Sequence, residues 1–163
     1  GDHRDLHYPL RRQRQMCIRD RRLISKSIEH FCRPKVYPNF LKNLLKTRSN
    51  KKMKRIGCTD SSDGLFQALQ DLARASKCKA IINYEKIPKD KDWPSGDKWD
   101  EYYFFGGEDY ELVFSLPKKW AKKLSNLDKN INEIGFFTEG EPSIEFNESE
   151  NNKLLNNAPF KHF

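Results

Sequence analysis

The sequence predicts an α/β or α+β domain in which a mixed β-sheet is flanked by helices. Segments with helical periodicity alternate with segments that read as strands, and no repeat with a period of about 20–50 residues is visible. The 163 residues suit one domain that buries a hydrophobic core, and the 12% aromatic content argues against disorder over most of the length.

The first part of the chain combines two predicted helices with one predicted strand. Apolar residues at helical spacing predict helices over residues 23–31 and 40–45. A basic, polar loop is expected over 47–55, and a short strand over 56–59.

The strongest helix prediction covers residues 64–77, where apolar and small side chains fall on one face. That face holds Leu65, Leu69, Leu72, Ala73 and Ser76. Ser62 or Asp63 is expected to cap the start of this helix, because short oxygen-bearing side chains bond to the free N–H groups there.

After this helix, residues 79–87 read as a strand and 89–101 as a long polar loop. Alternation over 109–116 predicts a second strand, with one face formed by Tyr110, Leu112, Phe114 and Leu116. The aromatic residues 102–105 before it are expected to be core residues rather than a stacking platform.

The remaining elements are a helix over 118–127 and strands over 131–137 and 144–146, followed by a polar loop over 147–157. In the helix, Trp120, Leu124 and Leu127 are expected to point inward.

The net charge of +8 is concentrated at the N-terminal end of the chain. Residues 1–22 contain seven Arg, three Asp and no Lys, which gives half of that charge. We therefore interpret residues 1–21 as a non-native or disordered leader, and residues 22–163 as the domain.

The composition also narrows the cellular setting. No apolar run reaches the roughly 18 residues that a membrane span requires, and no secretory signal follows the basic start. Cys17, Cys32, Cys58 and Cys78 form no CxxC pair, so we expect reduced thiols in a cytoplasmic protein, with Cys58 and Cys78 half-buried.

Two carboxylates lie three residues apart in Asp60-Ser61-Ser62-Asp63. If Asp60 ends a strand and Asp63 precedes a helix, both point into one cleft, and carboxylate oxygens are ligands that Mg²⁺ prefers. The N–H groups at the helix start also favour an anion. A capped helix with solvated aspartates explains the same residue types, so both interpretations stay open.

The second candidate segment is Gly106-Gly107-Glu108. A glycine pair allows the backbone to approach a ligand closely or to adopt a positive φ, and Glu108 could accept hydrogen bonds from a substrate. An ordinary turn into a strand is the alternative.

Taken in order, the motifs resemble those of the thiamine-monophosphate kinase family. The family patterns D-x-S-D-G-L, G-G-E-D-Y-E-L, I-G and a closing aromatic-D-H-F match residues 60–65, 106–112, 134–135 and 160–163. The resemblance covers about residues 22–163 and implies the C-terminal domain of the aminoimidazole-ribonucleotide-synthetase-like fold.

The resemblance implies an ATP- and Mg²⁺-dependent transfer of a phosphoryl group to thiamine monophosphate, giving thiamine diphosphate. By position in the motifs, Asp60 and Asp63 resemble Mg²⁺ ligands, Ser62 an ATP contact, and Glu108 and Phe160 substrate contacts. Phosphoryl transfer depends mainly on positioning and charge neutralisation, which such residues supply.

Two departures from the family pattern are visible. Lys161 stands where the family has Asp, and nothing corresponds to the family's N-terminal domain, which bears most metal carboxylates and the main dimer contacts. We therefore expect a fragment with little or no turnover, whose partners are that missing domain, ATP and thiamine monophosphate. The full-length protein is expected to be a homodimer, with neither nucleic acid nor membrane as a partner.

Two other functions are compatible with the sequence. Another member of the same superfamily, such as an aminoimidazole ribonucleotide synthetase, is disfavoured by the complete G-G-E-D-Y-E-L string. A small basic nucleic-acid-binding module is suggested by the pI of 9.3, but the lysines after residue 22 are scattered rather than clustered.

Overall fold

The computed structural model describes residues 38–47, 56–89, 91, 93–107, 109–148 and 152–156. The predictions for residues 1–21 and 23–31 lie outside these described residues, as do those for Glu108 and Phe160.

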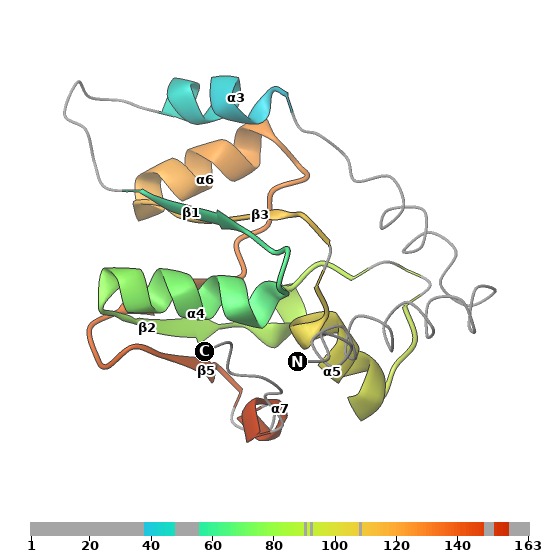
Figure 1. The fold of residues 1–163 in the computed structure, drawn as a ribbon. Coiled ribbons are helices and arrows are strands. Elements are labelled where there is room, and N and C mark those ends of the chain that lie inside the picture. The colour runs from blue at the N-terminus through green and yellow to red at the C-terminus, as the bar shows by residue number, and fades with distance from the viewer. Residues whose placement is uncertain are drawn as a thin grey trace, which may run out of the picture.

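The described elements alternate between helices and strands, which confirms the predicted fold class (Figure 1). In chain order they are α3 (Phe40–Thr47), β1 (Gly57–Asp60), α4 (Leu65–Ser76), β2 (Lys79–Ile82), the 3₁₀ helix η1 (Tyr84–Lys86), α5 (Asp97–Phe105), β3 (Leu112–Ser115), α6 (Lys118–Leu127), β4 (Gly135–Thr138), β5 (Ser143–Phe146) and α7 (Asn152–Asn156).

The five strands in the described part of the chain form two sheets. The mixed sheet has the order β4-β2-β5, in which β2 pairs antiparallel with β4 and parallel with β5. β1 and β3 form an antiparallel pair whose register places Asp60 opposite Leu112. The expected mixed sheet is therefore present, but the strand that ends in Asp60 belongs to the second sheet.

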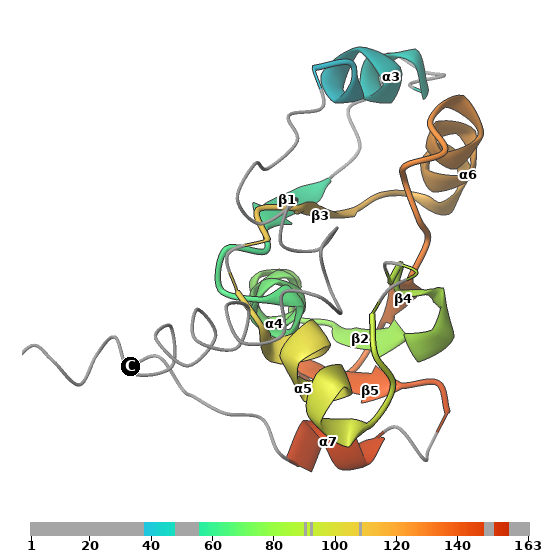
Figure 2. The same ribbon diagram turned by 90° about the vertical axis from the view of Figure 1, so that its right-hand side faces the viewer.

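Helix α4 lies between the two sheets and contacts both of them (Figures 1 and 2). Its inner residues Ala68, Leu69, Leu72 and Ala73 are buried, which confirms the predicted helix and most of its apolar face. Ser76, at the end of that face, is exposed. The start of α4 is thereby fixed relative to both sheets, and this start follows directly on the acidic residues of the first motif.

The core cluster joins α4, β2, β5 and α5. Phe104 of α5 is fully buried, with its ring 5.0 Å from that of Phe146 in β5 and 5.8 Å from that of Phe66 in α4. Tyr103 and Phe105 pack against the cluster, so the prediction that residues 102–105 belong to the core is confirmed for the last three. Tyr102 is partly buried, and its ring lies 6.2 Å from that of Trp99.

Several predicted boundaries were wrong. The strand expected over 79–87 ends at Ile82, because the Asn83 side chain accepts a hydrogen bond from the Lys86 N–H and starts a 3₁₀ turn. The expected polar loop over 89–101 contains the first turn of α5.

In the second half, the predicted strand 109–116 is confined to Leu112–Ser115, because Tyr110 has a φ of 54° that a strand does not accommodate. The strand expected over 131–137 starts only at Gly135, and the expected loop over 147–157 contains α7. Leu127 is 51% exposed rather than inward, whereas Trp120 and Leu124 are buried as predicted.

Within the described part of the chain, no helix is both long enough and apolar enough to traverse a bilayer.

Candidate functional site

The acidic loop, which we define as residues 60–64, connects β1 to α4. Asp60 is the last residue of β1, and both Asp60 and Asp63 are exposed, whereas Ser61 between them is only 3% exposed. The Ser62 hydroxyl donates a hydrogen bond to Asp60 Oδ1 at 3.2 Å. The loop therefore presents two carboxylates to solvent and anchors itself through a buried serine.

Neither Ser62 nor Asp63 caps α4, contrary to the expectation from the sequence. The N-cap residue is Gly64, with a φ of 94° and no side-chain hydrogen bond to the helix start. The Gly64 N–H instead donates to the Ser61 carbonyl at 3.0 Å, which closes a tight turn. Helix capping therefore does not explain why carboxylates and hydroxyls occur at these positions.

The two sequence motifs lie in direct contact, although 50 residues separate the partners in the chain. The Ser61 N–H donates to the Glu111 carbonyl at 2.9 Å, and the Glu111 N–H donates to the Ser61 hydroxyl at 3.0 Å. The acidic loop is thus joined to the segment that leads into β3.

The glycines of both motifs permit this contact. A Cβ atom on Gly64 would lie 2.7 Å from the Phe105 carbonyl oxygen, and one on Gly107 would lie 2.5 Å from the Ser62 carbonyl oxygen. Both distances are too short for real Cβ atoms. In the structure Gly107 approaches the backbone of the other motif, and the expected approach of the glycine pair to a ligand stays a prediction.

The donor atoms of the acidic loop fit a magnesium ion. Carboxylate and hydroxyl oxygens are hard ligands, and Mg²⁺ typically binds one or two carboxylates while waters and substrate phosphates complete its shell. No group of three or more His, Cys, Asp or Glu side chains suited to a metal occurs among the described residues. Asp60 and Asp63 would accordingly supply part of a shell.

The environment of Cys58 also differs from the prediction. The residue is exposed in β1 rather than half-buried. Local desolvation raises the pKa of the Cys58 thiol, and the negative charge of Asp60 raises it further.

A cavity of about 440 Å³ lies beyond the C-terminal end of α4, and Arg74, Lys77, Gly140, Glu141 and Pro142 line it. Among the predicted site residues that the structure describes, Asp60, Ser62 and Asp63 do not line this cavity. The acidic loop is at the other end of the helix, so the expectation of one open cleft holding both carboxylates stays a prediction.

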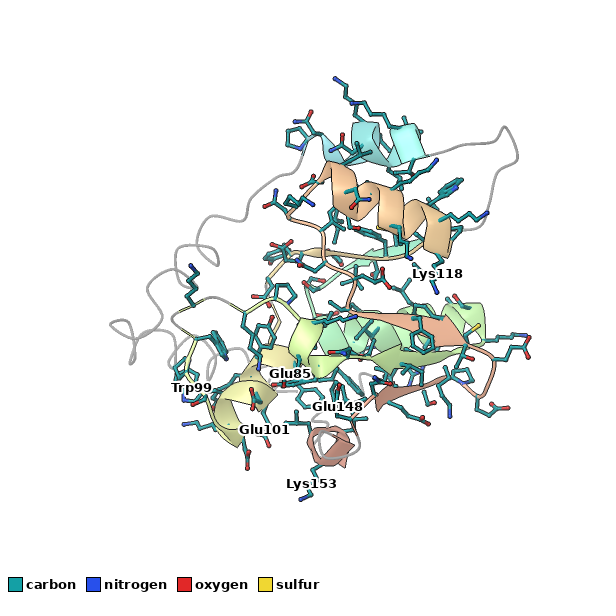
Figure 3. The ribbon with its side chains drawn as sticks, turned by 180° about the vertical axis from the view of Figure 1, so that it is seen from behind. Glu85, Trp99, Glu101, Lys118, Glu148 and Lys153 are labelled. Carbon is teal, nitrogen blue, oxygen red and sulfur yellow. The ribbon has the colours of Figure 1, made fainter. Side chains whose placement is uncertain are left out.

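A second polar cluster, which sequence reasoning missed, lies at η1 and α5. The Lys89 ammonium group bonds to Asp100 Oδ1 and to the Tyr84 hydroxyl, both at 2.9 Å. Burial, and then a hydrogen bond to Asp100, raise the pKa of Tyr84 well above its usual value. Figure 3 shows Trp99 and Glu101 on the same helix, α5, and the Trp99 ring lies 5.7 Å from that of Trp93.

Sequence reasoning also missed Ser61 and Glu111 as a contact between the two motifs. The available signal was a serine between two aspartates at the end of a predicted strand. Where the backbone turns away from a strand, a serine hydroxyl can accept a hydrogen bond that a backbone carbonyl would accept within the strand.

No family model matches the chain. The curated relatives and the solved structures that resemble it are thiamine-monophosphate kinases. Over 123 residues the chain is 37% identical to the thiamine-monophosphate kinase of Prochlorococcus marinus, an alignment that covers 76% of this chain and 37% of that protein. The chain thus spans little more than a third of the length of this relative.

Two solved structures share the fold. A structure described as AaThiL complexed with AMPPCP and TMP superimposes with a TM-score of 0.53 and 28% identity, covering 73% of this chain and 36% of the other. The thiamine-monophosphate kinase from Stenotrophomonas maltophilia gives a TM-score of 0.51 at 23% identity, over 56% and 31% of the two chains. The second likeness shows the fold alone.

Proposed function

We propose, from the homology of this chain to the thiamine-monophosphate kinases, that it is the C-terminal part of an ATP-dependent enzyme that phosphorylates thiamine monophosphate to thiamine diphosphate. The observation that carries the proposal is the hydrogen-bonded contact between the two motifs at Ser61 and Glu111. It joins the acidic loop to the segment that bears the family's G-G-E-D-Y-E-L string.

Asp60 and Asp63 are the proposed Mg²⁺ ligands, and Ser62 is the proposed ATP contact. A bound Mg²⁺ would neutralise charge on the phosphate oxygens. The Ser62 hydroxyl, by donating to Asp60 Oδ1, restricts the orientation of that carboxylate. The free N–H groups in the first turn of α4 favour an anionic phosphate beside the same loop.

Glu108 and Phe160 are the proposed substrate contacts, on the basis of their positions in the family motifs. An aromatic face together with a carboxylate suits the thiazolium cation of thiamine. Both residues lie outside the described part of the chain, so this assignment rests on the resemblance.

The proposed partners are the family's N-terminal domain, which would complete the metal shell, and a second copy of the full-length protein. Exposed apolar side chains beside the acidic loop support the first of these. Leu112, opposite Asp60 in the β1–β3 pair, is 45% exposed, and Tyr110 is 52% exposed. We propose the cytoplasm as the location.

The test is formation of thiamine diphosphate from ATP, Mg²⁺ and thiamine monophosphate, with and without an added N-terminal domain from the Prochlorococcus marinus relative. We expect no product from the chain alone and turnover when the domain is added. Robust turnover by the chain alone would show that the active site does not need the other domain. No turnover in the combined sample, with both parts folded and associated, would contradict the proposed function.

A further inference from the structure

We propose that Ser61 is a positioning residue, whose hydroxyl holds the acidic loop in its metal-binding geometry by bonding to Glu111. This inference rests on the proposed function, because it assumes that Asp60 and Asp63 bind the metal. Ser61 is buried, at 3% exposure, and is not one of the proposed metal or substrate ligands.

The argument begins with how the β1–β3 ladder ends. The register that pairs Asp60 with Leu112 makes Ser61 and Glu111 the next opposed pair. In an antiparallel ladder, opposed pairs alternate between those that exchange two backbone hydrogen bonds and those that exchange none. The Ser61 N–H donates to the Glu111 carbonyl at 2.9 Å, so this pair stands at a hydrogen-bonded position.

The Ser61 carbonyl accepts the Gly64 N–H at 3.0 Å and so closes the turn into α4. The Ser61 hydroxyl accepts the Glu111 N–H at 3.0 Å, in the place of the second backbone bond of the pair. One residue therefore satisfies the last strand bond with its side chain and the turn with its backbone.

This arrangement anchors the backbone between the two neighbours of Ser61. Asp60 ends β1 and Ser62 lies in the turn, with Ser61 held between them at 3% exposure. Ser62 then lies close enough to donate to Asp60 Oδ1. The backbone contact between Ser62 and Gly107 limits movement of the loop on its other side.

Removing the hydroxyl leaves the Glu111 N–H without this acceptor at a partly buried site, which favours a rearranged turn. We expect Ser61→Ala to weaken metal binding by about tenfold, since the loss of one such bond is typically worth about that factor. The matched control is Ser125→Ala, which removes a serine hydroxyl that bonds to the Lys122 carbonyl on α6.

The experiment uses the 163-residue chain combined with the added N-terminal domain, and Mn²⁺ as the probe, with free Mn²⁺ followed by electron paramagnetic resonance. Ser61→Ala should raise the dissociation constant about tenfold, whereas Ser125→Ala should leave it unchanged. In the unmutated chain, saturating Mg²⁺ should slow hydrogen exchange at the Glu111 amide. That measurement is independent of whether Ser61→Ala folds.

Asp60→Asn separates the two proposals. If Asp60→Asn weakens Mn²⁺ binding but Ser61→Ala does not, the positioning role is overturned and the proposed metal site stands. If Mg²⁺ leaves exchange at Glu111 unchanged in the unmutated chain, the positioning role is likewise overturned. Mn²⁺ binding that Asp60→Asn does not weaken would overturn both the proposed metal site and the role of Ser61.

Discussion

A Cβ atom on Gly64 would lie 2.7 Å from the carbonyl oxygen of Phe105, so the start of α4 and the end of α5 meet backbone to backbone. A side chain at this position would have to displace main-chain atoms rather than a flexible neighbour. The two motifs therefore depend on each other for their local conformation.

We expect Gly64→Ala to lower the free energy of unfolding by about 3 kcal/mol or more, because it adds a steric clash to the strain of a positive φ. The measurement is urea denaturation followed by circular dichroism. A loss below about 1 kcal/mol would show that the two backbones separate at little cost.

Gly96→Ala is the matched control for this experiment. Gly96 is also a helix N-cap with a positive φ, of 119°, but a Cβ atom there would meet nothing within 4 Å. Its cost should be limited to backbone strain, about 1–2 kcal/mol. The difference between the two variants measures the contact between the motifs.

We expect Asp60→Asn to abolish thiamine diphosphate formation in the chain combined with the N-terminal domain, while the melting temperature stays nearly constant. The side chain is exposed, and an amide oxygen preserves the acceptor for Ser62, so the change removes a proposed metal ligand rather than packing. Asp71→Asn on α4, where the carboxylate accepts only an exposed bond from Gln67, should retain activity. Equal activity of both variants would contradict the metal assignment.

The raised pKa of Tyr84 predicts that the stability of the fold changes at alkaline pH. Burial and the bond to Asp100 raise its pKa in the folded state, so above about pH 10 the unfolded chain releases the proton first. The free energy of unfolding should therefore fall as the pH rises from about 10 to 12.

In Tyr84→Phe the free energy of unfolding should fall less steeply with pH. At pH 7 it should be about 1 kcal/mol lower than in the unmutated chain, because the variant loses the hydrogen bond from Lys89. Other groups titrate in both proteins, so the difference between the two pH curves isolates Tyr84. Parallel curves from pH 7 to about pH 12 would contradict the burial of this hydroxyl.

We expect Phe104→Ala to lower the free energy of unfolding by about 3–5 kcal/mol, because it leaves a cavity at a fully buried site between α4 and β5. Phe136→Ala makes the same change at a side chain that is 60% exposed on β4, and should cost under about 1 kcal/mol. Thermal denaturation of both variants provides the comparison. Similar losses of stability in the two variants would contradict the assignment of Phe104 to the core.

The parts of the fold that could be predicted are those with strong periodicity. Helix α4 was predicted within one residue at each end, because its apolar side chains repeat at helical spacing and pack on both sheets. Helix α5 was missed because its apolar residues are crowded at one end, in residues 102–105, behind a polar and charged first turn. Its position depends on Phe104 packing against Phe146, a contact distant in sequence.

The family resemblance read from the motifs was confirmed by the comparisons, and the fold class by the structure. The expected cap of α4 was wrong, because a preference for Ser or Asp at helix starts is local, whereas the choice of Gly64 follows from the tertiary contact with Phe105 and Gly106. The roles of the acidic residues stay predictions.

The central strand of the mixed sheet has consequences for the order of folding. Residues 79–82 of β2 pair in parallel with residues 143–146 of β5, far along the chain. During synthesis β2 cannot pair with β5 until β5 has left the ribosome, so one edge of β2 stays unpaired until then. The long loop that this pairing closes also slows folding. Chains terminated before residue 143 should therefore expose an unpaired strand edge and aggregate.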